Sequence, residues 1–164
     1  MTIIIKNKYT LIFNEFKFRC CVGKNGFSKN KIEGDKKTPV GEFYLENLYF
    51  RKDRKEKPKT KLKVTEIKKN MGWCDNVNEK RSYNRLINLG PKIKGERLFR
   101  SDYKYDFIIP IKYNWTNIEI GKGSAIFIHL TKDFKPTDGC IGVSEKDFTI
   151  LAKLINRKTK IKIL

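Results

Sequence analysis

This 164-residue chain contains only one histidine, His129, so histidine is the scarcest of its potentially catalytic or metal-binding residues. Four cysteines are present, and no two of them form a Cys-x-x-Cys pair: Cys20, Cys21, Cys74 and Cys140. One histidine without such a pair cannot complete the usual ligand sets of zinc. The cysteine spacing also differs from the framework of a small disulfide-stapled domain. We therefore expect no structural metal and no disulfide framework, and we expect the protein to need no cofactor.

Long apolar runs are absent too. No stretch reaches the roughly 18–20 apolar residues of a membrane-spanning helix, so we expect no membrane span. The N-terminus, from Met1 to Ile5, leads into alternating sequence without the apolar core or cleavage site of a signal peptide. Hydrophobic residues still make up 39% of the chain, which is too much for a disordered protein. This content and the length indicate a single domain, residues 1–164, around one core.

Acidic residues are few beside the basic ones. The chain has 37 Lys and Arg against 18 Asp and Glu, a formal net charge of +19. Such a charge attracts polyanions and steers acidic ligands, which fits nucleic acid, an anionic cell-wall polymer or an anionic membrane surface. A coding bias toward A and T, which also fits the many Asn and Ile residues, would produce the same excess of lysine. The densest basic run, residues 51–59, has the pattern of a solvated loop. We expect non-specific attraction to polyanions and no specific nucleic-acid site.

Cys140 and His129 form the pattern with the most chemical content. Cys140 follows Gly139 and lies eleven residues after His129, which ends the apolar segment 123–129. A thiol needs a neighbouring base to become a thiolate near neutral pH, and imidazole has the closest unperturbed pKa. If the chain turns back through residues 131–139 and pairs antiparallel at Cys140, the two side chains meet. Gly139 would let the backbone aim amide N–H groups at a developing oxyanion.

Each of these residues also has a purely structural interpretation. A cysteine before an apolar run is usually a small core side chain, and a lone histidine on a strand is usually a satisfied structural residue. Their combination favours a nucleophile with its base. Cys74, beside Trp73, is the rival reactive thiol, and we rank it lower because no histidine lies near it in sequence.

The ordered motifs resemble the L,D-transpeptidase catalytic domain, also called the YkuD domain. Residues 33–43 resemble the early Thr-Pro-x-Gly-x-Phe signature of that family, and the His…Thr-x-Gly-Cys pattern ends at Cys140. Further matches, which resemble a small bacterial branch of the family, lie at residues 71–75, 83–85, 105–106 and 123–129. Together these motifs cover most of residues 20–155. Gly142 stands where many members carry an arginine, and Asp138 where many carry a second histidine.

The resemblance implies both a fold and a reaction. The fold is mainly β, a single YkuD-like domain of the β-sandwich or barrel type with few short helices. In the reaction, Cys140 attacks a peptidoglycan stem peptide to form a thioester, with His129 as the base, and an amine then takes the acyl group. With water as the acceptor, the same site would be an L,D-carboxypeptidase or an amidase. A third hypothesis is a non-catalytic, basic polyanion-binding module whose Cys/His pair is inert.

The resemblance also directs the choice of site residues. The oxyanion would be held by the backbone N–H groups of Gly139 and Asp138, together with that of the nucleophile. Stem peptides carry carboxylates, which guanidinium groups bind well, so we nominate Arg85 and Arg100 for substrate binding, with Thr137 beside them. We expect a monomer. The family implies the cell envelope or periplasm, whereas the lack of a visible signal peptide keeps the cytoplasm as an alternative.

Local patterns predict mainly strands, one helix and several loops. Alternating or apolar segments predict strands over residues 2–6, 9–13, 16–22, 42–50, 61–67, 105–113, 123–129 and 160–164. Loops are expected at 23–37 and 51–60, and residues 70–104 show no clear period. A helix is expected near 144–157, because Ser144 is a good N-cap and a stripe from Phe148 to Ile155 has helical spacing.

Overall fold

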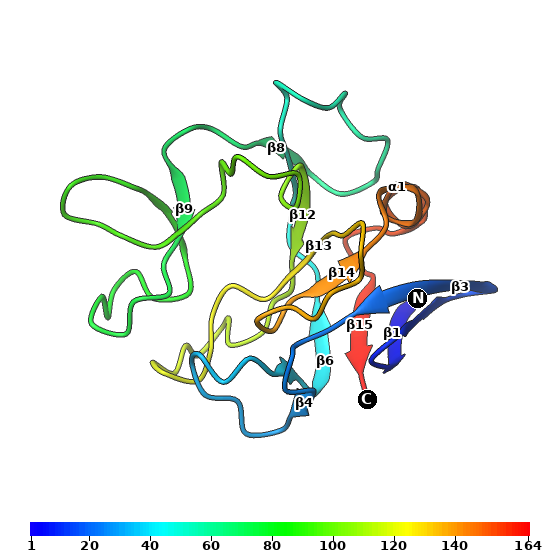
Figure 1. Cartoon of the computed structure of the whole chain (residues 1–164), viewed down its shortest axis with the longest axis horizontal. Helices are drawn as coiled ribbons and strands as arrows, with labels where there is room; N and C mark the ends of the chain where they lie inside the picture. The colour runs from blue at the N-terminus through cyan, green and yellow to red at the C-terminus, as the bar shows by residue number, and fades with distance from the viewer.

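The computed structural model describes all residues from Met1 to Leu164. A ten-stranded sheet dominates the molecule (Figure 1). In spatial order its strands are β6 (Gly41–Tyr44), β15 (Lys160–Ile163), β1 (Thr2–Asn7), β2 (Thr10–Phe13), β3 (Phe16–Cys21), β14 (Ile141–Val143), β13 (Phe127–Leu130), β12 (Phe107–Pro110), β7 (Leu48–Phe50) and β8 (Val64–Glu66). The mainly β fold expected from the sequence is confirmed. The single helix agrees with the expectation of few short helices.

The sheet curls into a half-barrel because segments far apart in its strand order meet at their ends. The backbone after β6 contacts the backbone after β12 through an antiparallel bridge between Leu45 and Ile111. Two hydrogen bonds flank that bridge, one from Lys112 N to Tyr44 O at 2.8 Å and one from Glu46 N to Pro110 O at 2.9 Å. The right-handed twist that strands adopt favours such curling. One concave face therefore encloses the main core.

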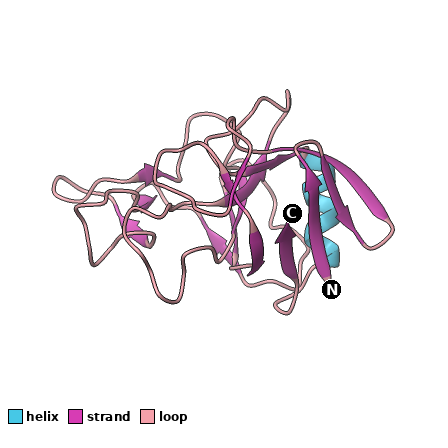
Figure 2. Ribbon diagram, turned by 90° about the horizontal axis from the view of Figure 1, so that it is seen from below, coloured by secondary structure: helices cyan, strands magenta, loops and turns pink.

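The helix α1 (Glu145–Leu154) closes part of this core, and Figure 2 shows it against the strands near the two chain termini. Ser144 caps it as predicted, since its side chain accepts a hydrogen bond from Asp147 N at 3.1 Å. Phe148 is buried and stacks on Phe107, with ring centroids 5.6 Å apart. The helix has ten residues and is neither long nor apolar enough to cross a membrane.

Two regions differ from the sequence-based expectation. The strand predicted at 42–50 is two strands, β6 and β7, because the chain turns at residues 45–47 to cross to another part of the sheet. Residues 70–104 hold a small separate sheet, in the order β10 (Leu86–Asn88), β9 (Met71–Trp73), β11 (Glu96–Arg97). Strands of two or three residues are too short to show a period of two. Another short pair, β4 (Phe27–Ser28) and β5 (Thr38–Pro39), lies within and just after the predicted loop.

Candidate active site

The side chains of strand β13 alternate between the two faces of the sheet, and this alternation determines the face on which His129 lies. Ile128 and Leu130 are buried in the main core inside the curled sheet. Phe127 and His129 point to the opposite face, because side chains alternate along a strand. On that face the ring of Tyr105 lies 5.7 Å from both the Phe127 ring and the imidazole, measured between centroids. His129 therefore belongs to the layer outside the main core.

Strand β14 brings Cys140 to the same face. In the β13–β14 ladder, Ile128 lies opposite Ile141 and His129 lies opposite Gly142. Cys140 precedes Gly142 by two residues and so shares its face of the sheet. The thiol and the imidazole are consequently neighbours one diagonal step apart across the ladder.

The two strands run parallel, which corrects the antiparallel return expected from the sequence. The loop 131–139 carries the chain from the end of β13 back to its beginning, so that β14 runs in the same direction as β13. On its other side β14 pairs antiparallel with β3, with Gly142 opposite Cys21. The spacing between His129 and Cys140 is compatible with either direction. Cys140 and His129 lie close together in either case, because side chains alternate in the same way in parallel and antiparallel ladders.

Two backbone groups hold the Cys140 thiol. It donates a hydrogen bond to Ala125 O at 3.2 Å, and its sulfur accepts one from Phe127 N at 3.3 Å. Burial raises the pKa of this thiol to about 12, and the negative charge of Glu96 acts in the same direction. The resting thiol is therefore protonated near neutral pH. Cys140 is partly exposed, whereas the other three cysteines are buried.

His129 is oriented by a backbone carbonyl. Its Nδ1 lies 2.8 Å from Leu130 O, and a carbonyl can only accept, so we place the proton on Nδ1 and leave Nε2 with a free lone pair. Burial lowers the pKa of the imidazole to about 4, partly opposed by the bond to Leu130. Neither Asp133 nor Asp138 is hydrogen-bonded to the ring, and neither is the Cys140 sulfur.

The turn before Cys140 has the strained backbone that its glycine predicts. Gly139 has φ +139°, and a Cβ atom at this position would lie 3.0 Å from Lys37 O. The Thr137 hydroxyl braces the turn by donating to Cys140 O at 2.6 Å and accepting from Gly139 N at 3.1 Å. The backbone N–H groups of Asp138 and Cys140 have no partner within the protein. Two amide donors are thus free at the turn, while that of Gly139 is engaged.

Thr38 anchors this turn from a distant part of the chain. Its fully buried hydroxyl donates to Gly139 O at 2.9 Å and accepts from Gly23 N at 2.9 Å. The Thr-Pro motif is therefore part of the support for the nucleophile turn. From the sequence alone, this motif indicated only the family resemblance and not a structural role.

Cys140 and His129 line one pocket of about 460 Å³. Its walls carry both signs of charge, from Lys31, Lys36, Arg100, Lys104, Lys135, Glu33, Asp75, Glu96, Asp133 and Asp138. Thr137 lines it as well, so five of the seven residues nominated from the sequence meet there. Of the other two, Gly139 lies in the turn directly before Cys140 without lining the pocket, and Arg85 is exposed just before β10 and does not contribute to it.

Arg100 lines the pocket, and neighbouring side chains hold its guanidinium in place. Its guanidinium forms an ion pair with Asp102 at 2.6 Å and lies 4.9 Å from the centre of the Tyr105 ring. Asp102 holds the pKa of this guanidinium above its usual value. A guanidinium fixed in this way keeps its charge and its direction when a carboxylate approaches.

Sequence reasoning missed three pocket groups: Glu96, Tyr105 and Lys31. The Tyr105 hydroxyl donates to a Glu96 carboxylate oxygen, and burial raises the pKa of that carboxyl. The pair lies beside both Cys140 and His129. Glu96 and Lys31 come from segments without periodicity, so no sequence pattern could have singled them out.

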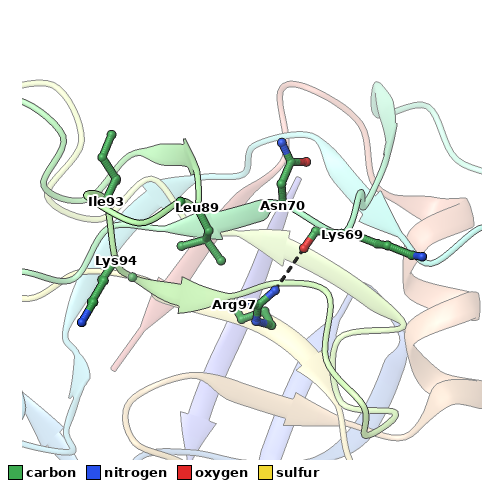
Figure 3. Close-up of a pocket in the computed structure, with 8 residues that line it drawn as sticks. Lys69, Asn70, Leu89, Ile93, Lys94 and Arg97 are labelled. Atoms are coloured by element: carbon green, nitrogen blue, oxygen red, sulfur yellow. Dashed lines mark hydrogen bonds between the residues drawn. The ribbon is translucent and has the colours of Figure 1, made fainter.

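A second hollow, of about 560 Å³, lies on the small sheet (Figure 3). Three cations line it, namely Lys69, Lys94 and Arg97, and Arg97 donates to Lys69 O at 3.1 Å. It contains no acid and no nucleophile, and it shares no residue with the pocket of Cys140. Of these two pockets, only that of Cys140 is lined by a thiol and an imidazole.

A curled sheet that displays a cysteine and a carbonyl-oriented histidine in one polar pocket defines a candidate thiol enzyme built on a β domain. The chain belongs to the YkuD family, the L,D-transpeptidase catalytic domain, whose model matches residues 2–163. Members of this family are cysteine-dependent L,D-transpeptidases that modify peptidoglycan, and they usually act in the cell envelope. The chain has no significant match in sequence among curated proteins.

Among solved structures, the chain is similar to the helical cell shape determining protein Pgp2 from Campylobacter jejuni. The TM-score is 0.53 and the sequence identity is 17%. The match covers 99% of this chain and 46% of Pgp2, so the chain spans less than half the length of that protein. The likeness shows that the two share a fold.

Proposed function

We propose that this protein transfers acyl groups between peptidoglycan stem peptides through a thioester on Cys140. The observation that carries the proposal is the shared pocket, because Cys140 and His129 line one cavity while the Nδ1 atom of His129 is engaged by Leu130 O. Family membership supports the choice of substrate. The cell envelope, where the family usually acts, is the proposed place of work.

In the first half-reaction His129 Nε2 takes the thiol proton as the sulfur attacks the carbonyl before the terminal D-amino acid. The carbon–nitrogen bond then breaks, the imidazolium returns the proton to the leaving amine, and the thioester remains. In the second half-reaction an acceptor amine gives a proton to His129 and attacks the thioester. The carbon–sulfur bond breaks, and Cys140 recovers its proton.

Proton transfer occurs together with the attack of the sulfur on the carbonyl carbon, because the Cys140 thiol and the His129 imidazole are both neutral before the reaction. Burial keeps the pKa of the thiol near 12 and that of the imidazole near 4, so the neutral pair is the resting form. A bound substrate changes this balance by placing a carbonyl carbon against the sulfur. The negative charge then develops on the carbonyl oxygen instead of on a buried thiolate.

The developing oxyanion needs amide donors at the nucleophile turn. The free N–H groups of Asp138 and Cys140 are available there. That of Gly139 joins them if the substrate displaces its bond to the Thr137 hydroxyl. Removing one such donor typically costs about 10²–10³ in rate.

A pair of incubations tests the proposed function. The protein is mixed with a stem tetrapeptide, with and without an amine acceptor, and the products are identified by mass. We expect a cross-linked or amine-exchanged product when the acceptor is present. A hydrolysed tripeptide under both conditions would instead indicate a carboxypeptidase. An unchanged tetrapeptide would contradict acyl transfer.

Alkylation should modify Cys140 before Cys74. Cys140 is partly exposed in the pocket, whereas Cys74 is fully buried. The pKa of Cys140 lies near 12, so its thiolate fraction rises with pH up to that value and is lost as the pH falls. We therefore expect the rate with iodoacetamide to increase about tenfold per unit between pH 7 and pH 10.

Peptide mass mapping at each pH provides the measurement for this labelling. Faster modification of Cys74 would reverse the assignment of the reactive thiol. A rate for Cys140 that levels off below pH 8 would show a preformed thiolate and contradict the neutral resting pair.

Arg100 and Thr137 border the bound stem in this proposal. Replacing Arg100 with alanine should lower kcat/KM on a stem tetrapeptide by about 10- to 100-fold, because a charged hydrogen bond to a carboxylate is lost. Arg81 is an exposed arginine outside the pocket, so Arg81→Ala is the matched control. If Arg100→Ala leaves kcat and KM unchanged, the arginine has no role in binding.

A further inference from the structure

Lys31 is a buried cation in the wall of the Cys140 pocket. Only 4% of the residue is exposed, although lysine is one of the least frequently buried residue types. Its ammonium is 2.7 Å from an oxygen of Asp35 and 3.5 Å from Ile32 O. The residue lies in the segment between β4 and β5, within the predicted loop 23–37.

The contacts within the protein leave the Lys31 ammonium incompletely satisfied. An ammonium group has three donors, and only Asp35 provides a short acceptor. The Asp35 carboxylate is itself shared, because it also accepts from the backbone N–H groups of Ile32 and Lys37 at 2.9 Å. A buried charge is costly unless it is well paired, so this cation has capacity for another anionic partner.

The position of Lys31 identifies that partner. Its aliphatic stem fills the space beside Gly123, where a Cβ atom would lie 2.8 Å from Lys31 Cε. Its Nζ lies 3.8 Å from where a Cβ atom would be at Gly139, the residue before the nucleophile. In a peptide with a free C-terminus, the terminal carboxylate carbon is two bonds from the nitrogen of the last amide. A donor peptide whose last amide bond lies in the pocket therefore also places its terminal carboxylate there.

A side chain at position 142 cannot supply this contact. A Cβ atom on Gly142 would lie 2.6 Å from Cys21 Sγ and 3.3 Å from Thr131 Cβ, so the space is already filled. Lys31 instead lines the pocket and reaches the nucleophile turn at Gly139.

We propose that Lys31 binds the terminal carboxylate of the acyl donor and so directs Cys140 to the last peptide bond. This inference rests on the proposed function and adds to it a specificity for donors that end in a free carboxylate. The Lys31–Asp35 ion pair keeps the ammonium in place when no donor is bound.

The test compares two donors and follows acylation of Cys140 by intact mass. One donor is a stem tetrapeptide with a free carboxylate, and the other is the same peptide with a C-terminal amide. The wild type should be acylated about 10- to 100-fold faster by the acid, since a charge-assisted hydrogen bond is at stake. Lys31→Met should lose this preference by slowing the acid alone, and Lys31→Arg should retain part of it.

Two further variants separate binding from folding. Lys31→Met leaves the half-buried Asp35 without its cation, so the double variant Lys31→Met/Asp35→Asn removes both charges and should show the same loss of preference. Lys29 is exposed in the same segment and does not line the pocket, so Lys29→Met is the matched control and should retain the wild-type preference.

Three results would overturn the proposal for Lys31. The first is a wild type that acylates with both donors equally, and the second is a full preference for the acid in a folded Lys31→Met or double variant. The third is an equal slowing of both donors in these variants, which would give Lys31 a structural role only. The absence of any adduct on the wild type with either donor would instead overturn the proposed acyl transfer itself, and this proposal with it.

Discussion

Cys140→Ala and Cys140→Ser are expected to abolish acyl transfer while the fold persists. Alanine has no nucleophile, and a serine hydroxyl is far less acidic than a thiol, so an imidazole that has no acidic partner activates it poorly. We expect activity to fall by at least about three orders of magnitude, as for other nucleophiles that act as a unit with their base. Serine retains a donor for Ala125 O and an acceptor for Phe127 N, so its stability should change little.

The measurement is turnover of a stem tetrapeptide, with thermal unfolding of each variant recorded in parallel. Cys74→Ser is the matched control, because Cys74 does not line the pocket, and it should retain activity if it folds. Normal turnover by a folded Cys140→Ala variant would remove the nucleophile from the mechanism.

His129→Ala should be nearly as damaging as the loss of the thiol. Without a base, the proton of a thiol with a pKa near 12 has no acceptor during attack. We expect a fall in kcat/KM of at least about two orders of magnitude, at the lower end of what general-base catalysis contributes. The change also removes the hydrogen bond to Leu130 O and leaves a cavity, so the variant should be somewhat less stable.

His129→Asn separates these two effects. Asparagine can donate to the Leu130 carbonyl but has no side-chain base near neutral pH, so it should be better folded and equally inactive. Alkylation of Cys140 should persist in both variants, because that reaction needs only the thiolate present at high pH. Acylation of a folded His129→Asn protein at the wild-type rate would show that another group takes the proton.

The proximity of Cys140 and His129 was predictable from the sequence, and the direction of the strands was not. Strand side chains alternate whether neighbours run parallel or antiparallel, so a histidine at a strand end and a cysteine at the next strand start can share a face either way. The direction depends on the antiparallel pairing of β14 with β3, a contact between distant parts of the chain. The helix was predictable because its cap and its apolar stripe are local signals.

The pocket walls could not be predicted for a related reason. Lys31, Glu96 and Arg100 come from segments without periodicity and meet only because the curled sheet and the small sheet bring those segments together. Arg85 was nominated on the same chemical grounds as Arg100, yet it lies exposed outside the pocket. Residue type identifies which side chains can bind a carboxylate, and only the tertiary fold determines which of them face the nucleophile.

Intact-protein mass spectrometry after mixing with a stem tetrapeptide tests the thioester most directly. We expect a mass increase equal to the tetrapeptide minus its terminal amino acid, mapped to Cys140 by peptide digestion and discharged by an added amine. No adduct on a folded protein, or an adduct on Cys74 instead, would contradict acyl transfer through Cys140.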